Sequence, residues 1–235
     1  MRSIFAVCLS LSLGVAGFAA AQAEKPESVE DRASYGLGLN MGRQMTAQGV
    51  RINVDLLARG LRDGLAGSES LLTDQEIQTA MQTLQQQVQQ AMQAKMAAEA
   101  EANQKAGDAF LAGNAVKEGV VTLESGLQYK VVTNGAGSLP VSSDTVRVHY
   151  EGRLIDGTVF DSSYQRGQPA EFQVTGVIQG WIEALQLMKV GSKWELYIPS
   201  ALAYGQRGQG PKIGPNAVLV FDVELLEIVS PESES

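Results

Sequence analysis

The chain has 235 residues, of which 44% are apolar, and its formal charge is −8. This length suits one large domain or two small ones, each able to bury a core. Both halves are acidic, because residues 24–117 hold nine basic and twelve acidic side chains and residues 118–235 hold eight and fourteen. Such a balance builds no phosphate-binding surface, so nucleic acid is not expected as a partner.

The first 23 residues have the features of a secretory signal peptide. Arg2 precedes an apolar run from Ile4 to Ala21, and Ala21-Gln22-Ala23 provides the small residues that signal peptidase requires. Serines and glycines interrupt the run, which makes a retained membrane helix the weaker interpretation. We expect cleavage before Glu24 and a location in the periplasm, with outer-membrane association or the cell surface as further possibilities.

Cysteine and histidine usage restricts the chemistry. Cys8 is the only cysteine and lies in the predicted signal peptide, so the mature chain should have no thiol. A disulfide framework, a thiolate nucleophile and a cysteine-based zinc site are excluded together. With His149 as the single histidine, no metal site and no cofactor are expected.

Aromatic residues divide the remaining chain into two modules. Ten of the fourteen lie between Tyr129 and Phe221, whereas residues 24–117 contain only Tyr35 and Phe110. We therefore predict a helical module over 24–117, a second module over 118–230 and a tail over 231–235.

Residues 29–65 show the spacing of amphipathic helices, with apolar residues and glycines recurring every three or four positions. Gly36, Gly38 and Gly42 each cost about 1 kcal/mol relative to alanine in an isolated helix. Close helix–helix contact would compensate for this cost, and a partly ordered region is the alternative.

A long helix is predicted to begin at Thr73, which forms a capping box with Glu76. No proline or glycine follows until Gly107, so the helix should extend to about Leu111. Its apolar stripe, formed by Ile77, Met81, Leu84, Val88 and Ala91, needs a partner. A homodimer through the first helices meets that need, and packing against the chain's own short helices is the alternative.

Five of the seven methionines lie in this helical module: Met41, Met45, Met81, Met92 and Met96. Flexible thioethers suit surfaces that bind varied apolar partners, but they also serve as ordinary gap fillers.

The second module is predicted to be mainly β, with one short helix. Residues 119–123 lead into strands that are expected at 127–132, 146–154, 170–174, 193–198 and 219–226. Ile178, Trp181, Ile182 and Leu185 have helical spacing. The predicted fold class is α+β, with an antiparallel sheet wrapped over that helix and preceded by the helical module.

The segment from Val146 to Tyr164 places an aromatic ring beside a carboxylate. Alternation along 146–154 points Tyr150 inward, and Asp156-Gly157 predicts a two-residue turn that returns residues 158–160 along the sheet. Phe160 and Asp161 should then border a cavity. His149 falls on the outward face and is interpreted as a solvated residue.

Few groups in this chain could perform covalent or metal-assisted catalysis. No pair of carboxylates is placed for hydrolysis, and no glycine-rich phosphate loop is present. What remains is an apolar cavity that binds and can distort its ligand. Its expected lining is Tyr150, Phe160, Asp161, Val177, Ile178, Trp181, Tyr204 and Phe221.

Four segments carry a resemblance to a known family: VHYEGRLIDGTVFDSS, VIQGWIEALQLMKVG, IPSALAYG and VLVFDVELLEI. In this order, over residues 118–228, they closely resemble the FKBP-type peptidyl-prolyl isomerases. RINVDLLARGLRDGLAG and ESGLQYKVV are similar to the dimeric periplasmic branch, the macrophage infectivity potentiator (Mip) and FkpA type.

The resemblance implies an isomerase that assists the folding of exported proteins, with chaperone activity. The implied catalytic residues are Tyr150, Phe160, Asp161, Trp181, Tyr204 and Phe221, and the implied substrate-binding residues are Arg166, Val177, Ile178 and Ile213. The Ile178 amide and the Tyr204 hydroxyl would bond substrate carbonyls, while Arg166 would hold Asp161. No covalent bond has to break, since the site acts by binding the twisted X-Pro amide.

The implied partners are unfolded or proline-containing polypeptides, a second copy of the chain and macrolides of the rapamycin class. Macrolide affinity is open, because Ala170, Gly176, Gln209 and Lys212 depart from the family pattern. The alternative function is a non-catalytic dimer or surface adhesin that only holds proline-containing segments. A pure coiled-coil scaffold would leave the β module unexplained.

Overall fold

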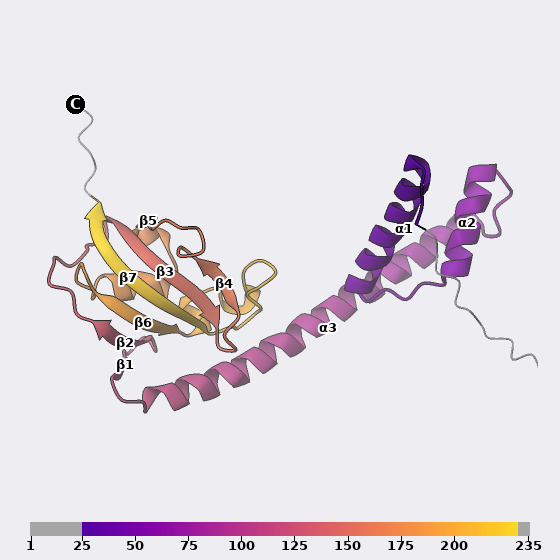
Figure 1. Cartoon of the computed structure of the whole chain (residues 1–235). Coiled ribbons are helices and arrows are strands. Elements are labelled where there is room, and N and C mark those ends of the chain that lie inside the picture. The colour runs from indigo at the N-terminus through magenta and orange to yellow at the C-terminus, as the bar shows by residue number, and fades with distance from the viewer. Residues whose placement is uncertain (1–24, 230–235) are drawn as a thin grey trace, which may run out of the picture. The chain divides into compact units, whose positions relative to one another are not determined.

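The structure is a computed structural model that describes residues 25–229 and divides into two compact units, 1–71 and 72–235. The predicted signal peptide and the tail at 231–235 lie outside the described residues. The first unit holds the helices α1 (Val29–Ala47) and α2 (Val54–Ala66), and the second holds α3 and the β module (Figure 1). Within residues 25–229, no helix is both long and apolar enough to cross a membrane.

The helices α1 and α2 begin at polar caps and bury none of their residues. The Ser28 side chain accepts a hydrogen bond from the Asp31 amide, and the Asn53 side chain accepts from Asp55 and Leu56. A Cβ added at Gly36, Gly38 or Gly42 would meet nothing within 4 Å. The close contact predicted at these glycines is therefore not made within residues 25–71 of the first unit.

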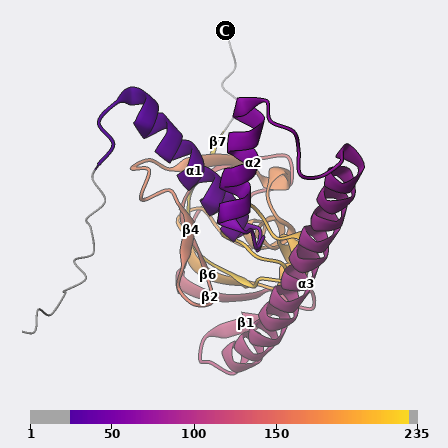
Figure 2. The same cartoon turned by 90° about the vertical axis from the view of Figure 1, so that its right-hand side faces the viewer.

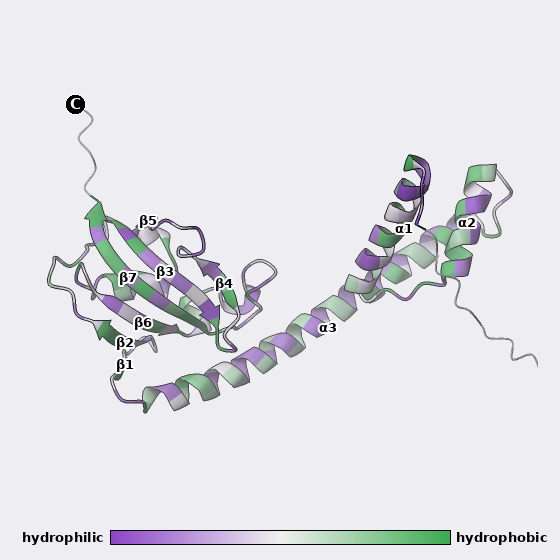
Figure 3. Cartoon of the chain, viewed as in Figure 1, coloured by the Kyte–Doolittle hydropathy of each residue, from purple (hydrophilic) through white to green (hydrophobic). Residues whose placement is uncertain are grey.

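The helix α3 runs from Asp74 to Ala115. Its predicted start is confirmed, because Thr73 and Glu76 form both bonds of the capping box. Its 42 residues correspond to about 63 Å at 1.5 Å per residue. It ends four residues beyond the predicted Leu111, passing through Gly113. Figure 3 shows polar and apolar residues interspersed along it, without a continuous apolar stretch.

The β module is a seven-stranded antiparallel sheet with the order β1-β2-β6-β7-β3-β4, in which β5 also pairs with β3. Its strands are β1 (Val120–Thr122), β2 (Gln128–Thr133), β3 (Thr145–Leu154), β4 (Val159–Ser162), β5 (Ala170–Gln173), β6 (Lys193–Ile198) and β7 (Leu219–Val229). The helix α4 (Gln179–Leu185) buries Trp181, Ala184 and Leu185 in the core of this module. The predicted α+β fold is confirmed.

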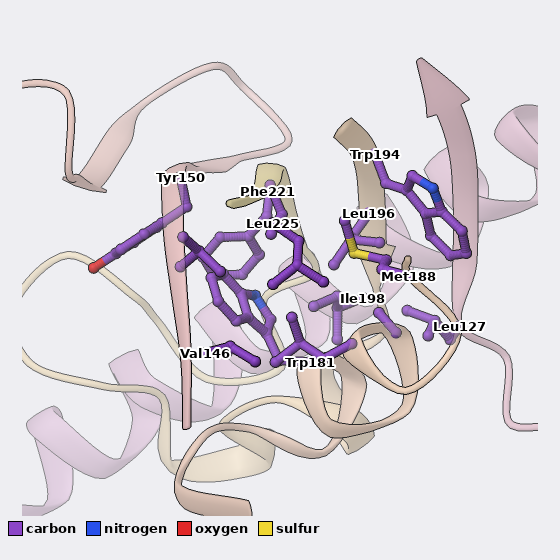
Figure 4. Packing of buried hydrophobic residues seen from close by; sticks show 14 of the residues in the cluster. Leu127, Val146, Tyr150, Trp181, Met188, Trp194, Leu196, Ile198, Phe221 and Leu225 are labelled. Atoms are coloured by element: carbon purple, nitrogen blue, oxygen red, sulfur yellow. The ribbon is translucent and has the colours of Figure 1, made fainter. Parts of the chain in front are cut away.

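Alternation along β3 determines which side chains enter the core. Val146, Val148 and Tyr150 are buried, whereas Arg153 pairs on the other face with Glu195 at 2.7 Å and with Asp222. Figure 4 shows the resulting cluster, with Tyr150 at one end, Trp194 at the other, and Trp181 and Phe221 packed together near Tyr150.

The connection between β3 and β4 differs from the predicted two-residue turn. It spans residues 155–158, and the Leu154 amide donates to the Thr158 carbonyl at 2.9 Å. Gly152 pairs with Asp161 but Arg153 pairs with Val159, so Phe160 is the extra residue of a β-bulge. Bulges redirect side chains, and this one places Phe160 beside Phe221. Sequence alternation alone cannot reveal such a shift in register.

Candidate active site

A cavity of about 620 Å³ opens on the β module. It lies among β3, β4, β5, α4, β7 and the segment between η3 (Gly205–Arg207) and β7. Its lining is mostly apolar and aromatic, and consists of Tyr150, Phe160, Asp161, Phe172, Gly176, Val177, Ile178, Trp181, Tyr204, Gln209, Pro211, Lys212, Ile213 and Phe221.

The structure brings the predicted site residues together around this cavity. All of them line it except Arg166, which reaches it through contacts with Tyr150 and Asp161. Gly176, Gln209 and Lys212, which depart from the family pattern, also lie in the lining, whereas Ala170 does not.

Aromatic rings form the wall of the cavity in edge-to-face contacts. The Trp181 ring lies 5.3 Å from the rings of both Tyr150 and Phe221, at 89° and 81°. The rings of Phe160 and Phe221 are 5.5 Å apart at 84°. Edge-to-face contacts are favourable for aromatic pairs, so the rings hold one another in place.

Asp161 is the acidic group of the lining, and both of its oxygens are engaged. The Tyr150 hydroxyl donates to one oxygen and the Arg166 guanidinium pairs with the other. A second Arg166 nitrogen donates to the Tyr150 hydroxyl at 2.9 Å, and the guanidinium lies 5.4 Å from the centre of the Tyr150 ring. The three side chains therefore form a closed network that orients the carboxylate.

The protonation of the network follows from these contacts. Burial alone would raise the pKa of Asp161, but hydrogen bonds from Tyr150 and Arg166 and the positive charge of Arg166 hold it below its ordinary value. Burial raises the pKa of Tyr150, and its hydrogen bond to Asp161 acts in the same direction. Burial and the nearby charge of Asp161 raise the pKa of Tyr204. At neutral pH the site therefore holds an ionised carboxylate and neutral phenols.

Two donors at the cavity have no partner among residues 25–229. The Tyr204 hydroxyl makes no hydrogen bond there, and neither does the backbone N–H of Ile178, which precedes the first turn of α4. Both can donate to a bound carbonyl without breaking an existing bond.

Sequence reasoning missed Phe172 and Pro211 as lining residues. Alternation along β5 could have found Phe172, since Ala170 and Phe172 share the inward face and only the second is aromatic. No sequence pattern marked Pro211, because its segment reaches the cavity only in the folded chain. Beside it, the Lys212 ammonium donates to the Phe160 carbonyl at 3.4 Å and bridges the cavity wall to β4.

His149 lies outside the cavity but is not simply solvated. It is half-buried, lies 3.0 Å from the Ser163 hydroxyl through Nδ1, and stacks on Tyr164 at 4.7 Å. The predicted solvated role is therefore wrong in detail, because the residues after β4 fold over this face. No cluster of metal-ligating side chains occurs among the described residues.

The arrangement suits binding and reshaping of an apolar segment that carries carbonyl groups. The described lining contains no serine, threonine, cysteine or histidine, and its carboxylate is held by two partners. A site of this kind acts through shape, dryness and oriented dipoles.

Two family models match the chain. The FKBP-type peptidyl-prolyl cis-trans isomerase model covers residues 137–226, and the model of the domain amino-terminal to FKBP-type peptidyl-prolyl isomerase covers residues 30–131. The chain is 43% identical to the outer membrane protein MIP of Legionella longbeachae over 97% of both proteins. It is 48% identical to the FKBP-type 22 kDa peptidyl-prolyl cis-trans isomerase of Escherichia coli K12, over 86% of this chain and 97% of that one.

The crystal structure of Escherichia coli FkpA superposes with a TM-score of 0.69 at 42% identity, covering 86% of this chain and 97% of that one. The two family models together match residues in both units. The chain belongs to the FKBP-type peptidyl-prolyl cis-trans isomerases, and within them it is similar to the Mip and FkpA proteins.

Proposed function

We propose that this isomerase works without covalent chemistry, by binding the twisted X-Pro amide in the aromatic cavity. Rotation about the C–N bond removes amide conjugation and reduces charge separation, so an apolar environment favours the twisted form over the planar isomers. The single observation that carries this proposal is the aromatic wall of Trp181, Phe221 and Phe160 around a cavity whose described lining has no serine, threonine, cysteine or histidine.

Each predicted site residue receives a role in this proposal. Tyr150, Phe160, Trp181 and Phe221 form the apolar walls, together with Val177, Ile178 and Ile213. The Tyr204 hydroxyl and the Ile178 N–H bind substrate carbonyls. Asp161, oriented by Arg166, presents a fixed negative edge to the rotating amide, and its lowered pKa argues against a role as proton donor.

A protease-coupled peptide assay tests these roles. Tyr204→Phe and Asp161→Ala should each lower kcat/KM, by about tenfold if one hydrogen bond of about 1.4 kcal/mol is lost in the transition state. Tyr164→Phe is the matched control, because its hydroxyl contacts Glu224 outside the cavity. If kcat/KM falls in both site variants while the cellular role persists, the alternative of a binding module or adhesin is favoured. Unchanged kcat/KM in both variants would contradict the roles given to Tyr204 and Asp161.

We also propose that the first unit forms a homodimer. In α1 and α2 no residue is buried, and large apolar side chains such as Tyr35, Leu61 and Leu65 are 64%, 64% and 82% exposed. Helices of 19 and 13 residues gain most of their stability by burying an apolar face. Gly38 and Gly42 line a shallow groove on α1 that a second copy could fill.

Sedimentation of residues 24–235 tests dimerisation. The wild-type chain should sediment as a dimer at micromolar concentration, and Leu61→Asp should shift it to a monomer. Arg62→Ala, on the adjacent exposed residue, is the control. A wild-type monomer would contradict the proposal.

We also propose that the protein binds unfolded client proteins and that it is exported from the cytoplasm. Met41, Met81, Met92 and Met96 are each exposed by about half, which suits binding of varied unfolded segments. The sequence of residues 1–23 directs the chain to the periplasm, with the outer membrane or cell surface as further sites. Suppression of aggregation of a reduced, unfolded protein tests the chaperone role, and fractionation of cells tests the location.

Macrolides of the rapamycin class are proposed ligands of the same cavity. Its aromatic wall favours them, while Lys212 and Gln209 add polar groups to the rim. Titration of tryptophan fluorescence with rapamycin in a Trp194→Phe variant, in which Trp181 is the remaining tryptophan, tests this proposal; an unchanged emission would contradict it.

A further inference from the structure

The segment 208–218, which joins η3 to β7, lies between the cavity and the helix α3. On one side Gln209, Pro211, Lys212 and Ile213 line the cavity, and Ile213 is buried within the core cluster. On the other side its residues contact α3. A movement of this segment would therefore change the shape of the cavity.

Backbone hydrogen bonds join residues of this segment to one another and to Gly205. The Gln209 amide donates to the Ile213 carbonyl at 2.8 Å, and Ile213 returns a bond of 3.3 Å. The Asn216 amide donates to the Gly205 carbonyl at 2.8 Å, and Asn216 adopts a φ of 56°. Because these bonds fix its internal shape, the segment should move as one piece rather than residue by residue.

The helix α3 holds this piece from the outside through two side-chain amides. The Asn103 amide donates to the Pro215 carbonyl at 2.8 Å, and the Asn216 amide donates to the Ala100 carbonyl at 3.4 Å. Both contacts are partly buried and join residues more than a hundred positions apart in the chain.

The fit between helix and segment is close. A Cβ at Gly214 would lie 2.2 Å from Glu99 Oε1, and a Cβ at Gly107 would lie 2.6 Å from Val218 Cγ2. The turns of α3 from Glu99 to Gly107 therefore lie directly against residues 214–218.

The end of α3 is itself fixed to the sheet. The Asn114 and Gln128 side chains, both buried, form a hydrogen bond of 2.9 Å, and Gln128 also donates to the Leu111 carbonyl at 3.0 Å. The rings of Phe110 and Tyr197 lie 6.0 Å apart. Figure 2 shows from a second direction that α3 ends beside β1. The helix can therefore serve as a rigid support.

We propose that Asn103 is a positioning residue for the isomerase reaction. By holding the Pro215 carbonyl, it sets the position of Ile213 and Lys212 in the cavity wall, so that the connecting helix determines how tightly the cavity grips substrate. This inference rests on the proposed assignment of the cavity as the reaction site. Among residues 25–229, Asn103 makes no hydrogen bond to a residue that lines the cavity. It acts through its hydrogen bond to the Pro215 carbonyl.

The test uses the full mature chain with three variants. Asn103→Asp keeps the shape but removes the donor, Asn103→Leu removes all polar character, and Asn103→Gln keeps the amide. Gln104→Ala is the matched control, because among residues 25–229 the exposed Gln104 side chain donates a hydrogen bond to Asp108 alone. The measurements are KM and kcat for a proline tetrapeptide, the thermal midpoint, and amide hydrogen exchange of residues 205–218.

Loss of the Asn103 amide donor should raise KM about three- to tenfold, while kcat should stay within about twofold of the wild-type value. The reason is that the part of the cavity wall formed by Ile213 and Lys212 is displaced, whereas the aromatic rings keep their positions. Exchange should increase in residues 208–218 and stay unchanged in β3 and α4. Asn103→Gln should recover part of the wild-type KM, and Gln104→Ala should match the wild type.

The inference would be overturned if Asn103→Asp had a lowered thermal midpoint but wild-type KM and kcat at temperatures well below that midpoint. It would also be overturned if amide hydrogen exchange in this variant rose uniformly across the β module. If Asn103→Asp does not fold, Asn103→Leu carries the same test. Failure of the site assignment is distinguishable, since Tyr204→Phe would then leave the kinetics unchanged while exchange at 208–218 still responds to Asn103.

Discussion

Replacing Gly152 by alanine should damage the cavity from within the sheet. Gly152 is buried on β3, where it pairs with Asp161 on β4 and Phe221 on β7. An added Cβ would lie 2.6 Å from ring carbons of both Phe160 and Phe221. Among the glycines of residues 25–229, Gly152 alone would place an added Cβ within 3 Å of two cavity rings.

The size of the effect follows from these distances. Carbon atoms pack at about 3.5–4.0 Å, so the two rings would have to retreat by about 1 Å. Overpacking of this kind costs about 1–3 kcal/mol of folding stability. A displacement of about 1 Å at a reacting site can reduce the rate about a hundredfold, so kcat/KM should fall between about tenfold and about a hundredfold.

The protease-coupled peptide assay measures this loss, and near-ultraviolet circular dichroism verifies that the variant is folded. Gly113→Ala is the control, because a Cβ at this α3 position meets nothing within 4 Å. It should keep wild-type kcat/KM and gain up to about 1 kcal/mol of stability. A folded Gly152→Ala protein with wild-type kcat/KM would refute the claim that these rings shape the reaction site.

Three further predictions concern pH and the helix α3. Between about pH 6 and about pH 9, kcat/KM should vary by less than about twofold, because the pKa of Asp161 is lowered and those of Tyr150 and Tyr204 are raised away from this range. A lowered folded-state pKa of Asp161 stabilises the fold above its ordinary value of 3.8, and this contribution is lost as pH falls through the folded value. Wild type should therefore be more stable than Asp161→Asn above about pH 4, and acid titration should show the difference shrinking below about pH 4. A bell-shaped rate profile centred near neutrality would contradict the assignment. Asn114→Ala should lower the free energy of unfolding by about 1–3 kcal/mol in urea titration, because it leaves the buried Gln128 oxygen without its donor; an unchanged midpoint would contradict this. Thr73→Ala should cost about 1 kcal/mol and reduce helicity by circular dichroism while kcat/KM is retained, and a fall in kcat/KM would show that the helix start matters to the cavity.

Much of the β module could be predicted because local rules and tertiary packing agree there. Period-two alternation along 146–154 correctly buried Tyr150, and helical spacing correctly placed Trp181 on a short helix. The capping box gave the start of α3 because its two hydrogen bonds lie within four consecutive residues.

Features that depend on distant parts of the chain were not predictable. The bulge at Phe160 arises from the register between β3 and β4, and Pro211 reaches the cavity only in the folded chain. The helix α3 continues past Gly113 because Asn114 finds a buried partner in Gln128. In each case the deciding contact involves a residue that sequence spacing does not identify.

The site itself was predicted in two different ways. The aromatic and apolar character of the lining follows from patterning of the residues. The pairing of Arg166 with Asp161 was implied by the family resemblance, and the side-chain contacts in the structure show that these residues meet.

The most direct test of catalysis in this cavity is the cis–trans exchange rate of a proline peptide, measured by NMR exchange spectroscopy with the intact mature protein. If X-Pro rotation is catalysed in this cavity, the protein should accelerate exchange and the peptide should shift the Trp181 indole resonance. A combined Phe160→Ala and Tyr204→Phe variant, although folded, should lose the acceleration. Acceleration that persists in the folded double variant would contradict catalysis in this cavity.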